Sequence, residues 1–115
     1  MNEADLYVYK ASVQRVIDGD TYLLDIDLGL HVHTHARVRL FGVNAPEIRG
    51  DDKDAGLAAT ARTVELLTLN GPVMVRTIKD RKEKYGRWLC HIVLADGRSL
   101  ADVLISEGHA KPAVY

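Results

Sequence analysis

The strongest constraint on the fold comes from the first forty residues, which carry three strand-like segments separated by only two short turn signals. The segments are residues 6–17, 21–28 and 31–41, and the breaks between them are Asp18-Gly19-Asp20 and Gly29. Strands joined by turns this short pair with their chain neighbours in antiparallel order. The sequence therefore predicts a three-stranded meander at the start of the chain.

Side-chain alternation predicts which face of each strand is buried. In the second segment the apolar face carries Tyr22, Leu24, Ile26 and Leu28. In the third segment it carries Val32, Val38 and Leu40. The opposite face of that segment carries Arg37, Arg39 and three histidines, His31, His33 and His35.

Helical spacing follows a loop over residues 42–53. Residues 54–69 are predicted to form a helix, with Asp54 as its N-cap and Asn70-Gly71-Pro72 as a stop signal. The expected buried stripe is Leu57, Ala61, Val64 and Leu67.

Two further strands and a short helix complete the chain. The strands are expected at residues 73–78 and 87–94, with a charged loop at 79–84 between them. The last helix is expected to be capped by Ser99 and to run through Glu107.

The order β-β-β-α-β-β-α predicts an α+β, mainly β, fold. It suits a five-stranded OB-type Greek-key barrel with a helix between strands 3 and 4 and a short helix after strand 5. The length of 115 residues suits a single domain over residues 1–115.

Composition narrows the functional classes only modestly. The formal net charge is −1, which counts mildly against non-specific binding of nucleic acid through overall charge. Cys90 is the single cysteine, so no internal disulfide forms, as expected in a reducing compartment. Residues 1–5 show no secretory signal and no apolar run approaches membrane-spanning length. We therefore expect a monomer without a membrane partner, with a cytoplasmic location favoured.

Charged residues gather around the predicted turns. Asp18-Gly19-Asp20-Thr21 lies at the first turn, Arg39 ends the third strand, Glu47 follows it, and Arg87 opens the fifth strand. Phosphodiester hydrolysis needs an attacking water, a base and positive charge for the phosphate. A cation held by carboxylates supplies part of that charge. The set contains each kind of residue.

Three ordered blocks of sequence resemble the staphylococcal nuclease (thermonuclease) family, over roughly Lys10 to Tyr115. They are Val16-Ile17-Asp18-Gly19-Asp20-Thr21, Arg37 to Glu47 (RVRLFGVNAPE), and Lys84-Tyr85-Gly86-Arg87 with Ala95-Asp96-Gly97. The resemblance implies an OB barrel with flanking helices. It also implies a calcium-dependent nuclease acting on DNA or RNA with little sequence specificity, with Mg²⁺ or Mn²⁺ as alternative cations.

The resemblance also implies roles for individual residues. The catalytic residues would be Arg39, Glu47 and Arg87, with Glu47 activating water and the two arginines holding the phosphate. The metal ligands would be Asp20, Asn44 and the backbone carbonyl of Ala45. The nucleotide pocket would be lined by Lys84, Tyr85 and Tyr115.

Asn44 departs from the family pattern, which has an aspartate at this metal-binding position. An amide still offers an oxygen, but the site loses one negative charge, so weaker metal binding and weaker activity are expected. Two alternatives therefore stay open. One is a catalytically weak or inactive OB module that binds nucleic acid, and the other is a protein-interaction module.

Three further residue patterns have a structural and a functional interpretation. His31, His33 and His35 have the spacing of a zinc site, but they are interpreted as a solvated polar strand face or as histidines near substrate phosphate. Cys90 lies in an apolar strand and is interpreted as a core residue. Trp88 is interpreted as packing or barrel surface rather than as a base-stacking platform.

Overall fold

The predicted meander is present. β1 (Val8–Asp18), β2 (Thr21–Gly29) and β3 (Val32–Leu40) pair as antiparallel neighbours in chain order. The computed structural model describes residues 2, 6–69, 71–82 and 86–113.

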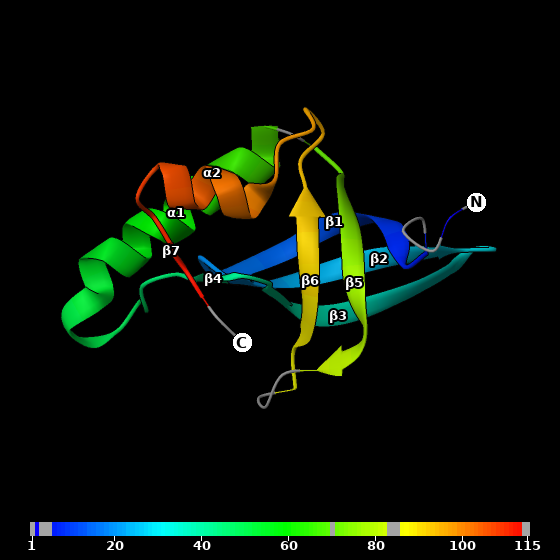
Figure 1. Cartoon of the computed structure of the whole chain (residues 1–115), viewed down its shortest axis with the longest axis horizontal. Coiled ribbons are helices and arrows are strands. Elements are labelled where there is room, and N and C mark those ends of the chain that lie inside the picture. Colours follow the sequence, from blue (N-terminus) through cyan, green and yellow to red (C-terminus); the bar gives the residue numbers. More distant parts are fainter. Residues whose placement is uncertain (1, 3–5, 70, 83–85, 114–115) are drawn as a thin grey trace.

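Two later strands close the meander into a barrel. β5 (Val73–Lys82) pairs antiparallel with β1 and with β6 (Trp88–Val93), so that the strand order is β1-β2-β3-β6-β5 (Figure 1). β3 and β6 run parallel, with Val38–Leu40 opposite Trp88–Cys90. The predicted mainly β, five-stranded OB-type barrel is therefore confirmed. β5 is longer than expected, because strand pairing continues to Lys82 through the first part of the predicted charged loop.

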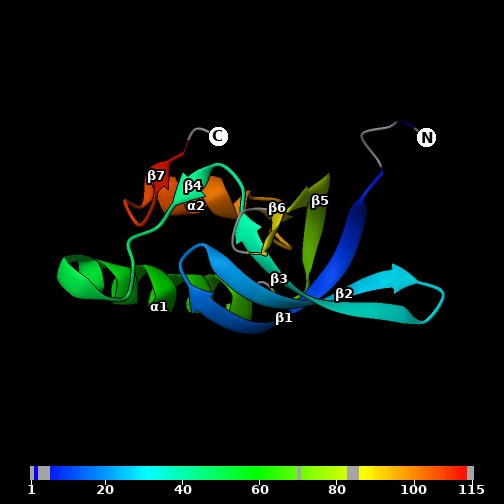
Figure 2. The same cartoon turned by 90° about the horizontal axis from the view of Figure 1, so that it is seen from below.

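Both predicted helices are present and cover one end of the barrel (Figures 1 and 2). α1 (Lys53–Leu69) follows β3, and α2 (Leu100–Ser106) follows β6, with Ser99 as the predicted N-cap. A small sheet was not predicted: β4 (Val43–Asn44) pairs with β7 (Lys111–Pro112). Two residues are too few for alternation to indicate a strand.

The predicted start of α1 is wrong by one residue, and so is its cap. A 3₁₀-helix (Gly50–Asp52) leads directly into α1, and the Lys53 N–H donates to the Gly50 carbonyl. Asp54 therefore lies inside the first turn of α1 rather than at its cap. The preceding turn satisfies a backbone group that a side-chain cap would otherwise bind.

The predicted buried stripe of α1 is wrong at three of its four positions, and only Leu67 is buried as predicted. Leu57 and Val64 are 47% and 46% exposed, and Ala61 is exposed as well. The buried residues of this helix are Gly56, Ala59, Thr63, Leu66 and Leu67. The first half of the helix packs the small residues Gly56 and Ala59 against the Glu47 backbone and Gly19, whereas the second half buries Leu66 and Leu67 in the core.

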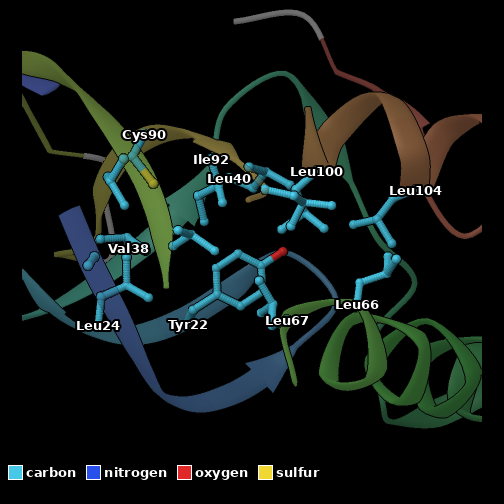
Figure 3. Packing of buried hydrophobic residues seen from close by; sticks show 14 of the residues in the cluster. Tyr22, Leu24, Val38, Leu40, Leu66, Leu67, Cys90, Ile92, Leu100 and Leu104 are labelled. Atoms are coloured by element: carbon cyan, nitrogen blue, oxygen red, sulfur yellow. The ribbon is translucent and has the colours of Figure 1, made fainter. Parts of the chain in front are cut away.

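The core lies between the barrel strands and the two helices (Figure 3). Its largest fully buried side chains include Tyr22, Leu24, Leu40, Leu66, Ile92, Leu100 and Leu104. Tyr22 is buried with its hydroxyl donating to the Gly19 carbonyl at 2.6 Å, so the ring anchors the β1–β2 turn from inside the barrel. Cys90 belongs to the same core, as predicted.

The β2–β3 hairpin extends away from the helices (Figure 2). Leu28 and Val32 near its tip are 44% and 51% exposed, although alternation predicted them to be buried. Leu30 and His31 form the turn with φ values of 56° and 62°, so His31 lies in the turn rather than on the predicted strand. The predicted alternation of side chains holds nearer the core, where Tyr22, Leu24 and Val38 are buried, but the barrel does not extend far enough to cover the hairpin tip.

Candidate functional site

The β1–β2 turn presents a buried carboxylate. The Asp20 N–H donates to the Asp18 Oδ1 at 3.1 Å, which is a side-chain-stabilised turn. Asp20 is only 7% exposed. Its carboxylate accepts hydrogen bonds from the Thr21 hydroxyl at 3.1 Å and from the Ala45 N–H at 2.9 Å. Asp20 therefore joins the turn to the segment that follows β3.

Arg39 lies opposite this turn because its Cα pairs with that of Thr21 across β2 and β3. One guanidinium nitrogen is 3.5 Å from the Asp20 Oδ2. The guanidinium also donates to the Asn44 Oδ1 and, at 3.2 Å, to the Leu40 carbonyl. The side chain is largely buried, so Arg39 is a fixed cation rather than a solvated strand residue.

Arg87 also reaches the β1–β2 turn, from the residue that precedes β6. It immediately precedes β6, whose first residues run parallel to the end of β3. Its Nη1 donates to the Thr21 hydroxyl at 2.8 Å. Two guanidinium groups thus converge on the Asp20-Thr21 pair from residues that lie 48 positions apart in the sequence.

Two carboxylates crowd the turn. Burial raises the pKa of Asp18 to about 6, and the hydrogen bond and charge repulsion from Asp20 act in the same direction. Burial, followed by the negative charge of Asp20, raises the pKa of Tyr22 well above its usual range, so its phenol stays a hydrogen-bond donor. A positive charge placed beside these carboxylates would be favourable.

The Asn44–Glu47 segment packs against α1 through glycine. A Cβ on Gly56 would lie 2.0 Å from the backbone oxygen of Glu47, and a Cβ on Gly19 would lie 2.7 Å from the Ala45 side chain. Only glycine therefore lets the turn, the segment and the helix approach this closely. The Glu47 side chain itself is exposed, and its backbone position is set by α1.

The sequence predictions for this site can now be placed. The structure brings together Asp20, Arg39, Asn44, Ala45 and Arg87, with Glu47 three residues after Asn44 on the same segment. Lys84, Tyr85 and Tyr115 lie outside the described residues. Sequence reasoning assigned no role to Thr21, which contacts both Asp20 and Arg87, or to Gly56. A glycine inside a helical pattern was the available signal for Gly56.

The described residues contain no group of three or more His, Cys, Asp or Glu side chains placed to hold a metal ion. The histidine pattern therefore does not form the zinc site considered above. His33 and His35 instead face Asp25, at 3.0 and 3.9 Å. The groups near Asp20 that could bind a metal ion do so through oxygen. They include the Asn44 amide and the carboxylates of Asp18 and Asp20. In the described part of the chain, no helix has the length and apolar character needed to cross a membrane.

Comparison with known proteins identifies the family. The sequence is 37% identical over 107 residues to the thermonuclease of Staphylococcus intermedius. The alignment covers 90% of this chain and 59% of that thermonuclease. It is 31% identical over 106 residues to the SPbeta prophage-derived endonuclease YokF of Bacillus subtilis (strain 168). That alignment covers 89% of this chain and 33% of YokF. The chain thus spans only part of the length of either relative. Residues 37–115 match the model of the staphylococcal nuclease homologues, and the chain belongs to this family.

Proposed function

We propose that the chain is a nuclease that hydrolyses phosphodiester bonds of DNA or RNA with little sequence specificity, and that it depends on a divalent cation. Ca²⁺ is the first candidate, with Mg²⁺ and Mn²⁺ as alternatives. The observation that carries the proposal is the convergence of Arg39 and Arg87 on the buried Asp20-Thr21 pair. The family membership and the nuclease names of both relatives support it.

The two arginines would bind the phosphate and stabilise the charge that develops on it. Arg39 is held by Asp20 and Asn44, and Arg87 is held by Thr21, before any substrate arrives. Donors fixed in advance do not have to reorganise during the reaction, and this is the usual source of large electrostatic catalysis. The guanidinium fork also matches two phosphate oxygens at once.

Glu47 would accept the proton of the attacking water. Its exposed side chain can be reached by water and substrate, while its backbone is held against Gly56 of α1. A base must lie within hydrogen-bond reach of the water it deprotonates, so this backbone contact sets where the carboxylate can go. Among the described residues of the site, the groups that converge are phosphate-binding and oxygen-ligand groups rather than base-reading ones, which supports weak sequence preference.

The donor set near Asp20 fits a hard cation. Asp20, the Asn44 amide oxygen and the Ala45 carbonyl would hold it, and all of them are oxygen ligands of the kind that Ca²⁺ and Mg²⁺ prefer. The crowding of Asp18 against Asp20 supports the fit, because a cation would offset their repulsion. When bound, the cation would supply positive charge beside the phosphate. Lys84, Tyr85 and Tyr115 are proposed to bind the nucleotide.

A second candidate is a weak or inactive module that binds nucleic acid without cutting it. Asn44 favours it, since this residue is neutral at a proposed metal-ligand position and its Oδ1 already accepts a hydrogen bond from Arg39. The two candidates share the phosphate-binding arginines and differ in whether a bound cation completes the site.

The test is a cleavage assay on plasmid DNA, single-stranded DNA and RNA, each with Ca²⁺, Mg²⁺, Mn²⁺ or a chelator. We expect cleavage of at least one substrate with at least one cation, and none with the chelator. Binding of an oligonucleotide without cleavage under any condition would support the non-catalytic module. Cleavage that persists in the chelator would contradict cation dependence.

A further inference from the structure

The barrel has an open end, away from the helices, where side chains enclose a groove of about 420 Å³. β3 pairs with β6 only over its last three residues in the described part of the chain, so the barrel wall opens beside the earlier half of β3. We call the result the aromatic groove. It is lined by Tyr7, Tyr9, Ile26, Leu28, Thr34, His35, Ala36, Val38, Thr77, Ile78 and Trp88.

Three of the eleven described residues that line this groove are Tyr or Trp. They are Tyr7, Tyr9 and Trp88, and two of them are substantially accessible, Tyr7 at 36% and Trp88 at 40%. Exposed rings beside apolar walls offer flat surfaces on which nucleobases stack, with little dependence on base identity. The groove therefore has the chemistry of a base-binding surface.

Charge separates the aromatic groove from the other cavities of the described residues. None of the described residues that line it carries a carboxylate. A cavity of about 220 Å³ near the β1–β2 face is lined by Asp25 and Asp27, which would repel a polyanion. A third cavity, between β1 and α1, contains no aromatic residue. Among these three cavities, the aromatic groove combines exposed aromatic rings with a described lining that contains no acidic residue.

The groove also begins next to the phosphate site. Val38 and Trp88 form the first pair between β3 and β6, and the neighbouring Arg39 and Arg87 project from the opposite face, toward Asp20 and Thr21. The groove and the arginines therefore lie on two sides of the edge at which the β3–β6 pairing begins. From Val38 to Thr34 the strand spans four residues, or about 13 Å, which leaves room for a short run of stacked bases. A nucleic-acid strand that crosses this edge would have its phosphate at the arginines and neighbouring bases in the groove.

We propose that the aromatic groove is a stacking subsite for unpaired bases that flank the phosphate being cut. This inference rests on the proposed function, because it takes the arginine site as the point of cleavage. The bases must be unpaired, since the faces of bases inside a duplex are already covered by their neighbours. The subsite thus favours single-stranded segments without reading their sequence.

The chain supplies its own probe, because Trp88 is its only tryptophan. We would titrate the protein in chelator and low salt with a single-stranded DNA 12-mer and record tryptophan fluorescence. Stacking on the indole predicts saturable quenching. The same strand annealed into a duplex should quench weakly, and inorganic phosphate should not quench at all. Absence of quenching by the single strand, or equal quenching by phosphate, would overturn the inference.

Variants separate stacking from general damage. Tyr9→Leu and Trp88→Leu should each weaken binding of a fluorescently labelled 12-mer by about fivefold to hundredfold, measured by anisotropy, whereas Trp88→Phe should retain binding. Met74→Ala is the matched control, because Met74 is 43% exposed on β5 and does not line the groove. Melting curves establish that each variant is folded. Unchanged binding by both folded Leu variants would contradict the inference.

The outcomes also separate this inference from the proposed function. Cleavage without quenching would leave the nuclease standing and reject the aromatic groove as a subsite. Quenching and weakened binding in the Leu variants, with no cleavage under any cation, would support the groove and reject the nuclease.

Discussion

The two ends of the barrel differ in how firmly their side chains are held and in how exposed they are. At the helix-covered end, short side chains and glycine bring a turn, a loop segment and two arginines into hydrogen-bonding distance. At the open end, the strands separate, apolar and aromatic side chains remain accessible, and the hairpin tip leaves Leu30 95% exposed. The first end fixes polar groups, whereas the second leaves a surface on which a ligand can lie.

Under the two proposals, this difference corresponds to separate roles for the two ends of the barrel. Fixed charges suit the chemical step, because catalysis needs donors that are already in position. Accessible rings suit binding of a flexible strand whose sequence varies, since every base has a face that can stack. Variants at the helix-covered end should therefore change the rate, and variants at the open end should change affinity.

Of the variants considered, Arg87→Ala should have the largest effect on the cleavage rate. Removing the guanidinium that binds Thr21 should lower cleavage at saturating substrate at least about a hundredfold, which is the usual scale for a lost transition-state donor. Arg98→Ala is the control, because Arg98 is exposed and paired with Asp96. A folded Arg87→Ala protein with near wild-type turnover would remove Arg87 from the site.

Gly56→Ala should lower turnover by roughly tenfold to a hundredfold with a small change in KM. Alanine is the better helix former, but its Cβ would meet the Glu47 carbonyl and displace the proposed base by more than 1 Å. Ala61→Leu adds bulk on the exposed face of the same helix and should leave turnover unchanged. If Gly56→Ala raises the melting temperature and keeps full turnover, the helix does not position Glu47.

Asn44→Asp should tighten calcium binding about tenfold. An added charge near the cation gains several kcal/mol at an effective dielectric near twenty, and repulsion from Asp18 and Asp20 offsets much of it, leaving roughly 1–3 kcal/mol. The new carboxylate would also pair with Arg39, which keeps the net gain toward the lower figure. Calcium titration by calorimetry measures it, and equal affinities would show that the charge at this position is unimportant.

The smallest effect concerns stability rather than the site. Arg62 binds Glu107 through two bonds of 2.6 and 2.9 Å and links α1 to α2. This pairing lowers the pKa of Glu107 below its usual 4.5, so its contribution is present above that pH and is lost as the pH falls through the lowered value. Glu107→Gln should melt slightly earlier than wild type at pH 7, and the two should coincide near pH 2. A gap that persists in acid would exclude the ion pair as its cause.

The sequence predicted the barrel because its strands carry regular alternation and are punctuated by Asp-Gly and Gly signals. It failed where tertiary contact overrides hydrophobicity. Leu57 and Val64 are exposed while the smaller Gly56 and Thr63 are buried, and at Gly56 the Glu47 backbone lies too close for any larger side chain. Alternation at Leu28 and Val32 likewise says nothing about how far the barrel extends.

The candidate site was predicted in part for a similar reason. Local motifs indicated Asp20, Arg39, Asn44 and Arg87, since each adjoins a recognisable turn or strand end. The role of Thr21 as the contact between Asp20 and Arg87 depends on β2, β3 and β6 meeting in space, which no local pattern encodes. The aromatic groove combines residues from positions 7–38 with residues from positions 77–88. The position of Trp88 in the sequence does not indicate that Tyr7 and Tyr9 lie beside it.

The central claim is that the helix-covered end is a hydrolytic centre with Glu47 as its base. The most direct measurement is the single-turnover rate of cleavage of a single-stranded oligonucleotide at saturating calcium, for wild type and Glu47→Gln, with Asp51→Asn as an exposed acidic control. The account predicts calcium-dependent cleavage by wild type and by the control, and a loss of at least about a hundredfold in Glu47→Gln with an unchanged melting temperature. Equal rates for wild type and a folded Glu47→Gln protein would contradict the claim.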